Sequence, residues 1–314
     1  MSPRWGRPPM PAGPCRCGAI PIMWRPHHPK NCWRCATCSS FNATPASSYM
    51  MRVRAFCAPR RAAMALQLTT FKIAEEAALA LALQVSEDLR MALASGPAGG
   101  RALLLVSGGR SPLPFFAALA QQPLPWEHID VSLVDERSVS SGDPDSNATL
   151  VGKHLLTGAA AAARLLPLMA VVAKATDPWL WARRSAQLAN ANPALARPAA
   201  IVLGLGADGH TASLFPDAPQ WPEAASTSRR YVALQPGQAP HARVSLSLRA
   251  LAAQRVCHVW SGGAAKLDVI MRAQALAAAV ADGLIDAAVL DDAGPFARLV
   301  ADPHITLKVY HSQA

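Results

Sequence analysis

An aspartate and a histidine stand two residues apart where an apolar run gives way to a glycine-rich turn. The run, Ala199–Leu205, follows Pro198 and contains β-branched residues, so it predicts a buried parallel strand. Asp208 and His210 come directly after it. Ligands of open α/β sheets bind outside the carboxyl ends of the strands, and an imidazole exchanges protons near neutral pH. The pattern predicts an active-site loop; a capped turn with a surface histidine is the alternative.

Two other predicted strands run into the same tripeptide, Ser-Gly-Gly, immediately before a helix. Arg101–Val106 leads into Ser107-Gly108-Gly109, and Arg255–Trp260 leads into Ser261-Gly262-Gly263. Free backbone N–H groups and the helix dipole at such a point favour an anion. Lys266, about one turn into the second helix, would add an ammonium group. We predict two phosphate-binding loops; plain tight turns and a solvated lysine are the alternative.

Charged residues also follow the strand expected at Ile129–Val134. They are Asp135-Glu136-Arg137, and Arg243 stands at the head of another strand, Val244–Leu248, whose apolar residues alternate with serines. Three charges at a strand carboxyl end form either a solvated turn or part of the same cleft. The spacing alone leaves both interpretations open.

Three glycines spell the dinucleotide-binding pattern G-x-G-x-x-G and need a separate explanation. Gly204, Gly206 and Gly209 follow a strand, as that pattern requires. A dinucleotide site also needs a long helix from the third glycine and an acidic residue about 20 positions later. Phe215-Pro216 interrupts any such helix, so we do not expect a nicotinamide cofactor.

The elements that must position these residues alternate between strand and helix. Apolar residues recur every four positions over Phe71–Ala94, which predicts an amphipathic helix that ends at Gly96-Pro97. The remaining expected features are a helix start with Ser111 as N-cap and Pro112 at the first helical position, a helix and a short strand (Leu165–Ala170) within residues 148–174, a helix from Asp177-Pro178 to about Asn190, a strand near Tyr231–Leu234, a helix from Gly294-Pro295 to Ala301 and a strand at Ile305–Tyr310. This order predicts a doubly wound, mostly parallel sheet with helices on both faces, in a Rossmann-like three-layer arrangement.

The charge of the chain is confined to its first segment. The net charge is +10, yet residues 1–63 hold ten of the 30 Lys and Arg and none of the 20 acidic residues. The remaining basic residues therefore balance the acids over 64–314. Basicity of the whole chain would have indicated a nucleic-acid or membrane-surface partner, and for residues 64–314 that inference disappears.

The same segment is rich in proline and cysteine and has no periodic apolar pattern. Cys32, Cys35 and Cys38 have a spacing that a zinc ion could use, but no second cysteine pair is properly spaced, so we expect no metal. We predict that residues 1–63 are a disordered extension or follow from a misplaced start codon, with Met64 as the natural start of a catalytic domain, residues 64–314. No run reaches 18 apolar residues, and Cys257 is alone in its domain, so we expect a cytoplasmic protein without membrane contact.

Five motifs in order resemble those of the 6-phosphogluconolactonases, within the glucosamine-6-phosphate isomerase/deaminase-like superfamily. The resemblance covers about residues 66–310. Its motifs are Ser107-Gly108-Gly109-x-Ser-Pro, Asp135-Glu136-Arg137-x-Val with Asp145-Ser146-Asn147, Gly204-x-Gly206-x-Asp208-Gly209-His210-Thr-Ala-Ser-Leu-Phe-Pro216, Arg243-x-Ser-Leu and Gly262-Gly263-x-x-Lys266. The chain departs from the family at Ser138 and Ser140, where an aromatic residue and a proline are frequent, and at its end, which lacks Asp-x-x-Ala.

The resemblance implies hydrolysis of 6-phospho-D-glucono-1,5-lactone to 6-phosphogluconate, with no metal or organic cofactor. His210 would take a proton from water, and Asp208 would orient the imidazole. Arg137, with Asp135 beside it, would act on the oxyanion or the sugar hydroxyls. The residues implied for the substrate phosphate are Ser107, Gly108, Gly109, Arg243 and Lys266.

Two other functions fit part of the pattern. A glucosamine-6-phosphate deaminase or isomerase would share the phosphate loops, but Arg137 and the Ser213–Pro216 tail favour the lactonase. A non-catalytic sugar-phosphate sensor would be expected to lose His210 or to gain a DNA-binding domain, and residues 1–63 show no helix-turn-helix pattern. The partner expected for the site is a small sugar-phosphate lactone and not a nucleic acid, and the chain is expected to be a monomer or a small homo-oligomer.

Overall fold

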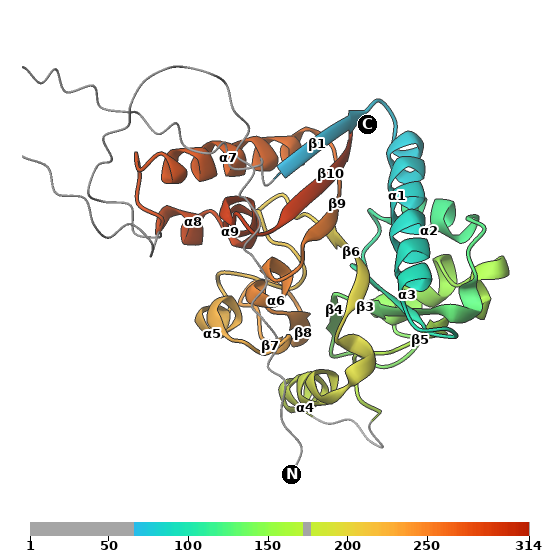
Figure 1. Cartoon of the computed structure of the whole chain (residues 1–314). Helices are drawn as coiled ribbons and strands as arrows, with labels where there is room; N and C mark the ends of the chain where they lie inside the picture. The colour runs from blue at the N-terminus through green and yellow to red at the C-terminus, as the bar shows by residue number, and fades with distance from the viewer. Residues whose placement is uncertain (1–65, 172–176, 314) are drawn as a thin grey trace, which may run out of the picture. The chain divides into compact units, whose positions relative to one another are not determined.

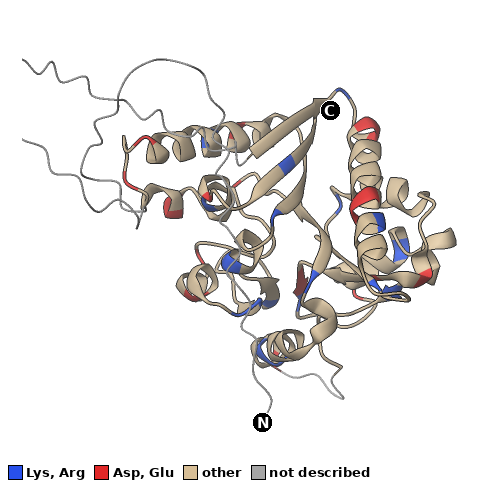
Figure 2. Ribbon diagram, in the orientation of Figure 1, with Lys and Arg blue, Asp and Glu red and all other residues tan. Residues whose placement is uncertain are grey.

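The computed structural model describes residues 66–171 and 177–313 of the 314-residue chain. Residues 1–63, for which we predicted a disordered extension, lie outside the described residues, and so do Cys32, Cys35 and Cys38. Within the described residues no helix is long and apolar enough to cross a membrane. Basic and acidic residues are mixed over the elements of this part (Figure 2), in keeping with the balanced charge of residues 64–314.

A parallel sheet of seven strands forms the centre of the described part (Figure 1). Its order is β1-β10-β9-β6-β2-β3-β5, and every neighbouring pair is parallel. The central strands β2 and β6 are continuous apolar runs, as expected for strands covered on both faces. The strands are β1 (Leu66–Phe71), β2 (Ala102–Val106), β3 (Ile129–Leu133), β5 (Arg164–Leu165), β6 (Pro198–Gly204), β9 (Val256–Gly262) and β10 (Thr306–Ser312).

Helices cover both faces of this sheet, which confirms the predicted fold class. The α-helices are α1 (Ala74–Ser95), α2 (Leu113–Ala120), α3 (Asn147–His154), α4 (Pro178–Ala191), α5 (Trp221–Ser226), α6 (Leu248–Ala252), α7 (Ala264–Ala281), α8 (Val289–Asp292) and α9 (Pro295–Ala301). Short 3-10 turns lie at Trp126–His128, Gly158–Ala162 and Pro193–Leu195. Helix α1 packs on α2 and on the central strands, whereas α7 and α9 pack together against β9 and β10 on the other side (Figure 1).

The direction in which the chain adds strands reverses between β2 and β6. After β2 the chain continues through β3 to β5 on one side, and β6, β9 and β10 follow on the other side. A ligand crevice forms at such a switch point, outside the carboxyl ends of the two strands. The loops that contain Ser107 and His210 leave β2 and β6 at this place.

A second, antiparallel sheet stands beside the carboxyl end of β3, and the sequence did not indicate it as a separate sheet. It consists of β4 (Asp135–Arg137), β8 (Arg243–Leu246) and β7 (Tyr231–Leu234), in the order β4-β8-β7. We expected Asp135–Arg137 to form either a solvated turn or part of the cleft after a strand, and not to be a strand; charged residues are rare in strands. Pairing with β8, more than 100 positions later in the chain, overrides that preference.

Three element boundaries differ from the expectation for identifiable reasons. Strand β1 was not predicted, because its pairing partner β10 lies at the far end of the chain. The strand expected at Leu165–Ala170 is only β5, since Pro167 has no N–H group to continue the ladder. The strand expected to reach Leu248 ends earlier because Ser247 caps α6, its Oγ accepting a hydrogen bond from Ala250 N at 3.1 Å.

Ser111 does not cap α2, which corrects a further prediction. The helix begins at Leu113, after Pro112, without a side-chain cap. The Ser111 hydroxyl instead accepts a hydrogen bond from the Trp260 indole N–H at 3.0 Å. This bond links the β2 loop to β9, so Ser111 supports the arrangement of the loops rather than the helix end.

A buried carboxylate, Asp130 of β3, forms ion pairs with residues next to or in two neighbouring strands, away from the carboxyl ends of the sheet. Asp130 is 4% exposed and lies between two guanidinium groups, with Arg101 Nε at 2.6 Å and Arg164 Nη2 at 2.6 Å from its two oxygens. Burial acts to raise the pKa of Asp130, but the hydrogen bonds and charges of Arg164 and Arg101 outweigh it and the pKa is lowered.

We expect Asp130→Asn to lower the free energy of unfolding by about 2–3 kcal/mol at pH 7, because the arginines lose a charged acceptor. A lowered carboxyl pKa contributes stability that is present above the unfolded value, about 3.9, and is lost as the pH falls through the folded value. The difference between the two proteins in the free energy of unfolding, measured by denaturant, should therefore begin to shrink below about pH 4 and close as the pH falls through the lowered folded value. Asp268→Asn, at an exposed position on α7, is the control. A difference that stays constant with pH would contradict the electrostatic explanation.

Candidate active site

The structure brings the predicted site residues together around one cavity of about 280 Å3. The cavity lies outside the carboxyl ends of β2, β6 and β9, and β4 and β8 of the small sheet form another wall. The predicted residues that line it are Ser107, Gly108, Gly109, Asp135, Arg137, His210, Arg243 and Lys266. Asp208, the remaining predicted residue, does not line this cavity but contacts His210.

His210 and Asp208 form a hydrogen-bonded pair in the turn after β6. The Nδ1 atom of His210 is 2.6 Å from Asp208 Oδ1, and the His210 backbone N–H donates to the same oxygen at 3.1 Å. The imidazole is 32% exposed and the carboxylate 62%. A carboxylate at Nδ1 keeps the proton on that nitrogen, which leaves Nε2 as the acceptor.

The Asp208 carboxyl is held in its ionised form by this contact. Burial acts to raise its pKa, but the His210 backbone hydrogen bond, the charge of His210 and the ring hydrogen bond together lower it. The side chain is largely exposed, so solvent screens much of this interaction. Its effect is therefore to orient the imidazole rather than to stabilise the fold.

The glycine at 206 is required by the His210–Asp208 pair. A Cβ atom at Gly206 would overlap His210 Nδ1 and Asp208 Oδ1. The turn is closed by hydrogen bonds from Gly206 N to His210 O, 2.8 Å, and from Gly209 N to Gly206 O, 3.2 Å. Gly209 has a φ of 87°, which favours glycine. The glycines that spell a dinucleotide pattern thus serve a tight turn around an ionisable pair.

In the loop after β2, close packing and backbone conformation each require a glycine. A Cβ atom at Gly108 would overlap the side chain of Asn147, the first residue of α3. Gly109 has a φ of 90°, in the left-handed region. Asn147 lines the cavity and donates from Nδ2 to the Asp135 carbonyl at 2.8 Å. Asn147 belongs to the Asp145-Ser146-Asn147 motif, but its sequence position did not predict a place in the site; its packing against Gly108 shows that it lines the cavity.

Glu136 positions Asn147 and is another residue whose role the sequence did not indicate. Its buried carboxylate accepts hydrogen bonds from the backbone N–H groups of Asn147, Ala148 and Arg137, at 2.7 to 2.8 Å, and from the Ser146 hydroxyl at 3.1 Å. Burial raises the pKa of Glu136, and these four hydrogen bonds offset part of the rise. The carboxylate thus holds the start of α3 against β4.

Lys266 lies in the first turn of α7 and is half-buried. Burial lowers its pKa, and no described carboxylate forms an ion pair with it. Gly263, before the helix, has a φ of 81°, so it also occupies a conformation that favours glycine. Nearby, burial and the charge of Lys266 lower the pKa of His311. This end of the cavity therefore offers a cation that lacks a protein counter-ion within the described residues.

Two arginines stand directly opposite each other on neighbouring strands. Arg137 on β4 pairs with Arg243 on β8 in an antiparallel register, and both line the cavity. Like charges opposite each other destabilise a sheet unless an anion lies between them or near them. Arg243 is 7% exposed, and burial lowers its pKa. This geometry suits an anionic ligand.

Hydrogen bonds fix the orientation of both guanidinium groups. Arg243 Nη1 donates to Ser213 Oγ at 3.2 Å, and Ser213 Oγ donates to Asp135 Oδ2 at 2.5 Å. Arg137 Nη1 donates to the Asp145 carbonyl at 2.6 Å. Asp135 thereby acts on Arg243 through Ser213, a connection that no sequence pattern could show.

Within the described residues, four of the seven buried side-chain polar atoms that have no hydrogen-bond partner lie at this cavity. Among the described residues, Ser107 Oγ, Arg137 Nε, Asn147 Oδ1 and Arg243 Nε are buried and have no hydrogen-bond partner. Each of these residues lines the cavity. Folded proteins leave few such atoms, and those that occur call for an explanation such as a bound ligand or a catalytic role. The same part of the chain holds no cluster of three or more His, Cys, Asp or Glu side chains arranged to hold a metal ion.

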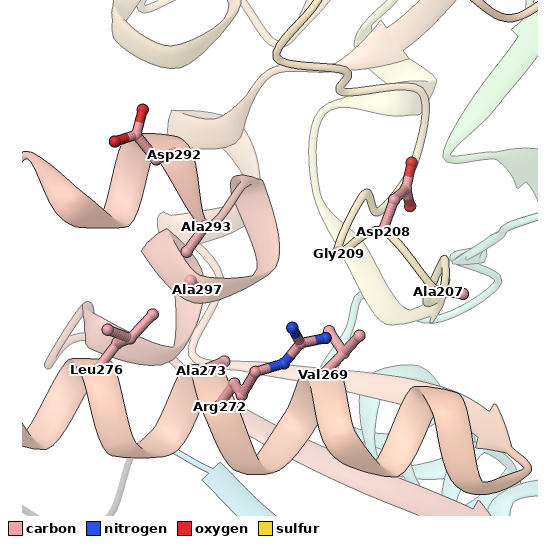
Figure 3. Close-up of a pocket in the computed structure, with 10 residues that line it drawn as sticks. All are labelled: Ala207, Asp208, Gly209, Val269, Arg272, Ala273, Leu276, Asp292, Ala293 and Ala297. Atoms are coloured by element: carbon pink, nitrogen blue, oxygen red, sulfur yellow. The ribbon is translucent and has the colours of Figure 1, made fainter.

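A second cavity, of about 340 Å3, has the same turn in its wall (Figure 3). Asp208 and Gly209 lie on one side, Val269 and Arg272 of α7 lie below them, and the α8–α9 segment closes the third side. Phe296 N donates to Gly209 O at 3.3 Å, which anchors the turn to α9. Its lining is formed mostly by glycine and apolar residues, with Asp208, Arg272 and Asp292 as the charged residues.

Comparison with known proteins agrees with this geometry. Residues 72–289 match the family model of glucosamine-6-phosphate isomerases and 6-phosphogluconolactonase. The chain is 42% identical over 207 residues to 6-phosphogluconolactonase of Pseudomonas aeruginosa, a match that covers 65% of this chain and 83% of that protein. The chain is also 41% identical over 205 residues to 6-phosphogluconolactonase of Pseudomonas putida, a match that covers 64% of this chain and 81% of that protein. The structure is similar to that of a 6-phosphogluconolactonase from Shewanella baltica, with a TM-score of 0.65 and 30% identity, over 78% of this chain and 96% of that chain.

Proposed function

The chain belongs to the family of glucosamine-6-phosphate isomerases and 6-phosphogluconolactonases. We propose that it acts as a 6-phosphogluconolactonase through the residues of the cavity described above. The enzyme hydrolyses 6-phospho-D-glucono-1,5-lactone to 6-phospho-D-gluconate, a step of the oxidative pentose phosphate pathway. The observation that carries the assignment is the His210–Asp208 pair at a cavity whose other walls present Arg137, Arg243 and Lys266.

His210 acts as the general base. Its Nε2 atom takes a proton from a water molecule while the water oxygen forms a bond to the lactone carbonyl carbon. The carbonyl oxygen becomes an oxyanion, which Arg137 stabilises with its guanidinium group. Collapse of this intermediate breaks the bond between that carbon and the ring oxygen, and the protonated imidazole returns its proton to the ring oxygen. The product is the open-chain carboxylic acid, which releases its proton to solvent and becomes the carboxylate. Asp208 keeps the neutral imidazole in the tautomer whose Nε2 atom can accept a proton.

The substrate phosphate binds in the same cavity. Arg243 and Lys266 supply positive charge, and the loop Ser107-Gly108-Gly109 supplies backbone N–H groups. Arg243 is held rigidly by Ser213 and by the Pro240 carbonyl, which accepts from Nη2 at 3.1 Å. Binding the phosphate at a fixed place holds the lactone carbon in position relative to His210.

The test is an assay of proton release, or of a coupled reaction, on freshly made 6-phosphogluconolactone with the full chain. We expect turnover well above spontaneous hydrolysis. Glucosamine 6-phosphate should yield no ammonia, which separates this function from the deaminase alternative. A protein that binds 6-phosphogluconate without turning over the lactone would instead be a sugar-phosphate-binding module.

We further propose that residues 64–314 are the catalytic unit of a cytoplasmic enzyme. Strand β1 begins at Leu66 and pairs with β10, so a chain that starts at Met64 keeps every described element. We expect this shorter chain to equal the full chain in thermal midpoint and in activity, because residues 1–63 have no apolar pattern with which to dock on it. Calorimetry and the lactone assay on both chains check this. A clearly less stable short chain, or stoichiometric zinc in the full chain alone, would contradict it.

A further inference from the structure

One aromatic ring contacts a residue from each functional half of the site. The Phe215 ring stacks on His210, with centroids 4.4 Å apart and planes at 27°. The guanidinium carbon of Arg243 lies 5.3 Å from the centroid of the same ring. We propose that Phe215 is a positioning residue that orients both the imidazole and the guanidinium group. This inference rests on the proposed function of His210 and Arg243.

The backbone after His210 is folded so that Phe215 returns to the histidine. Thr211 and Leu214 form an isolated bridge, with Leu214 N donating to Thr211 O at 3.1 Å. The Thr211 hydroxyl donates to the Gly204 carbonyl at 2.8 Å, which fixes the turn to the end of β6. Ala212 has a φ of 53°, which is unusual for a residue with a side chain. A tight turn with a strained residue is thus maintained at the point that brings Phe215 onto His210.

The His210 ring needs a contact of this kind. Among the described residues, the imidazole forms a side-chain hydrogen bond with Asp208 at Nδ1. This bond fixes one atom of the ring but not the plane of the ring. The neighbouring position, Gly206, contributes no side chain that could support the imidazole. A stacked aromatic ring restricts the tilt of the imidazole, and with it the direction in which Nε2 points.

For Arg243 the ring supplies a face for the cation. The guanidinium group is buried, its Nη atoms donate to Ser213 and Pro240, and its Nε atom has no partner among the described residues. A cation over an aromatic face is attracted by the electron density of the ring. Phe215 therefore contributes to both steps that the site must perform, orientation of the base and binding of the phosphate.

The test compares Phe215→Leu, which keeps an apolar side chain, with Phe215→Tyr, which keeps the ring. We expect Phe215→Leu to lower kcat about 10–100-fold on 6-phosphogluconolactone, because a small misplacement of a base has an effect of this size. Its affinity for 6-phosphogluconate, measured by titration calorimetry, should fall about 3–10-fold. Phe215→Tyr should retain both values. Phe71→Leu, which removes an aromatic ring that stacks on Tyr310, is the matched control.

A double-mutant cycle separates positioning from a general loss of structure. In an Arg243→Ala background, Phe215→Leu should no longer weaken the binding of 6-phosphogluconate, because its partner is absent. Unphosphorylated gluconolactone should show the loss of kcat alone. A folded Phe215→Leu variant with unchanged kcat and product affinity would overturn the inference, and so would a loss that is equal with and without Arg243. Failure of the proposed function looks different, since the unaltered chain would then not turn over the lactone, or His210→Ala would retain its full activity.

Discussion

Replacing His210 with alanine should lower kcat by about 10²–10⁴, the contribution of a well-placed general base. Substrate affinity should survive, because the residues proposed to bind the phosphate are untouched. The loss should therefore fall on kcat and kcat/KM alike, the pattern of an interaction made only in the transition state. Steady-state kinetics with subtraction of spontaneous lactone hydrolysis measure both values, and binding of 6-phosphogluconate confirms that the site remains intact.

Two further variants make this test specific. Asp208→Asn keeps a side chain of the same shape but removes the negative charge at Nδ1, so we expect a partial loss of kcat. His304→Ala, at an exposed position before β10, is the control for histidine replacement and should leave activity unchanged. If His210→Ala kept the kcat of the wild type, the base would have to be sought elsewhere in the cavity.

Replacing Lys266 or Arg243 with alanine should raise KM about 10–150-fold, which corresponds to the loss of a charge-assisted hydrogen bond of about 1.5–3 kcal/mol. The kcat value should change little if the substrate still reaches the same position. Lys266→Ala is the cleaner of the two variants, since Lys266 is half-buried and forms no described ion pair. Arg243 is buried and bonded to Ser213, so its variant also needs a thermal unfolding measurement.

The phosphate group of the substrate provides an internal control for this prediction. Unphosphorylated gluconolactone has nothing for either cation to bind, so both variants should process it as the wild type does. Lys72→Ala, an exposed lysine before α1, controls for the loss of a positive charge. An equal loss on both lactones would assign Lys266 and Arg243 to another part of the substrate.

Much of the large sheet could be predicted because most of its strands have a recognisable local sequence pattern. The runs at β2 and β6 are short, apolar and close to glycine or proline, the runs at β3 and β9 are short and mostly apolar, and the structure confirms all four strands. The N-cap at Asp177, which accepts a hydrogen bond from Leu180 N at 2.9 Å, could also be predicted from the sequence. Strands β1 and β4 could not be predicted, because each depends on a partner strand that is distant in sequence.

The same distinction applies to the cavity. Residues at strand ends, such as Ser107, His210 and Lys266, could be grouped from the sequence because parallel strands present their carboxyl ends at one edge. Asn147, Ser213 and Glu136 act through packing and hydrogen bonds between segments that the sequence does not connect. Their contribution became visible only when α3 was placed against Gly108 and β4 against β8.

The position of β10 in the sheet has a consequence for how the protein is made. This strand is the last of the described strands to be synthesised, yet it lies between β1, the first described strand, and β9. Until it is synthesised, β1 has no neighbour and β9 has an open edge, and unpaired edges favour aggregation. Contacts between such distant segments slow folding. The sheet therefore cannot be completed before β10 (Thr306–Ser312) is available, so loss of β10 would be far more damaging than its seven residues suggest.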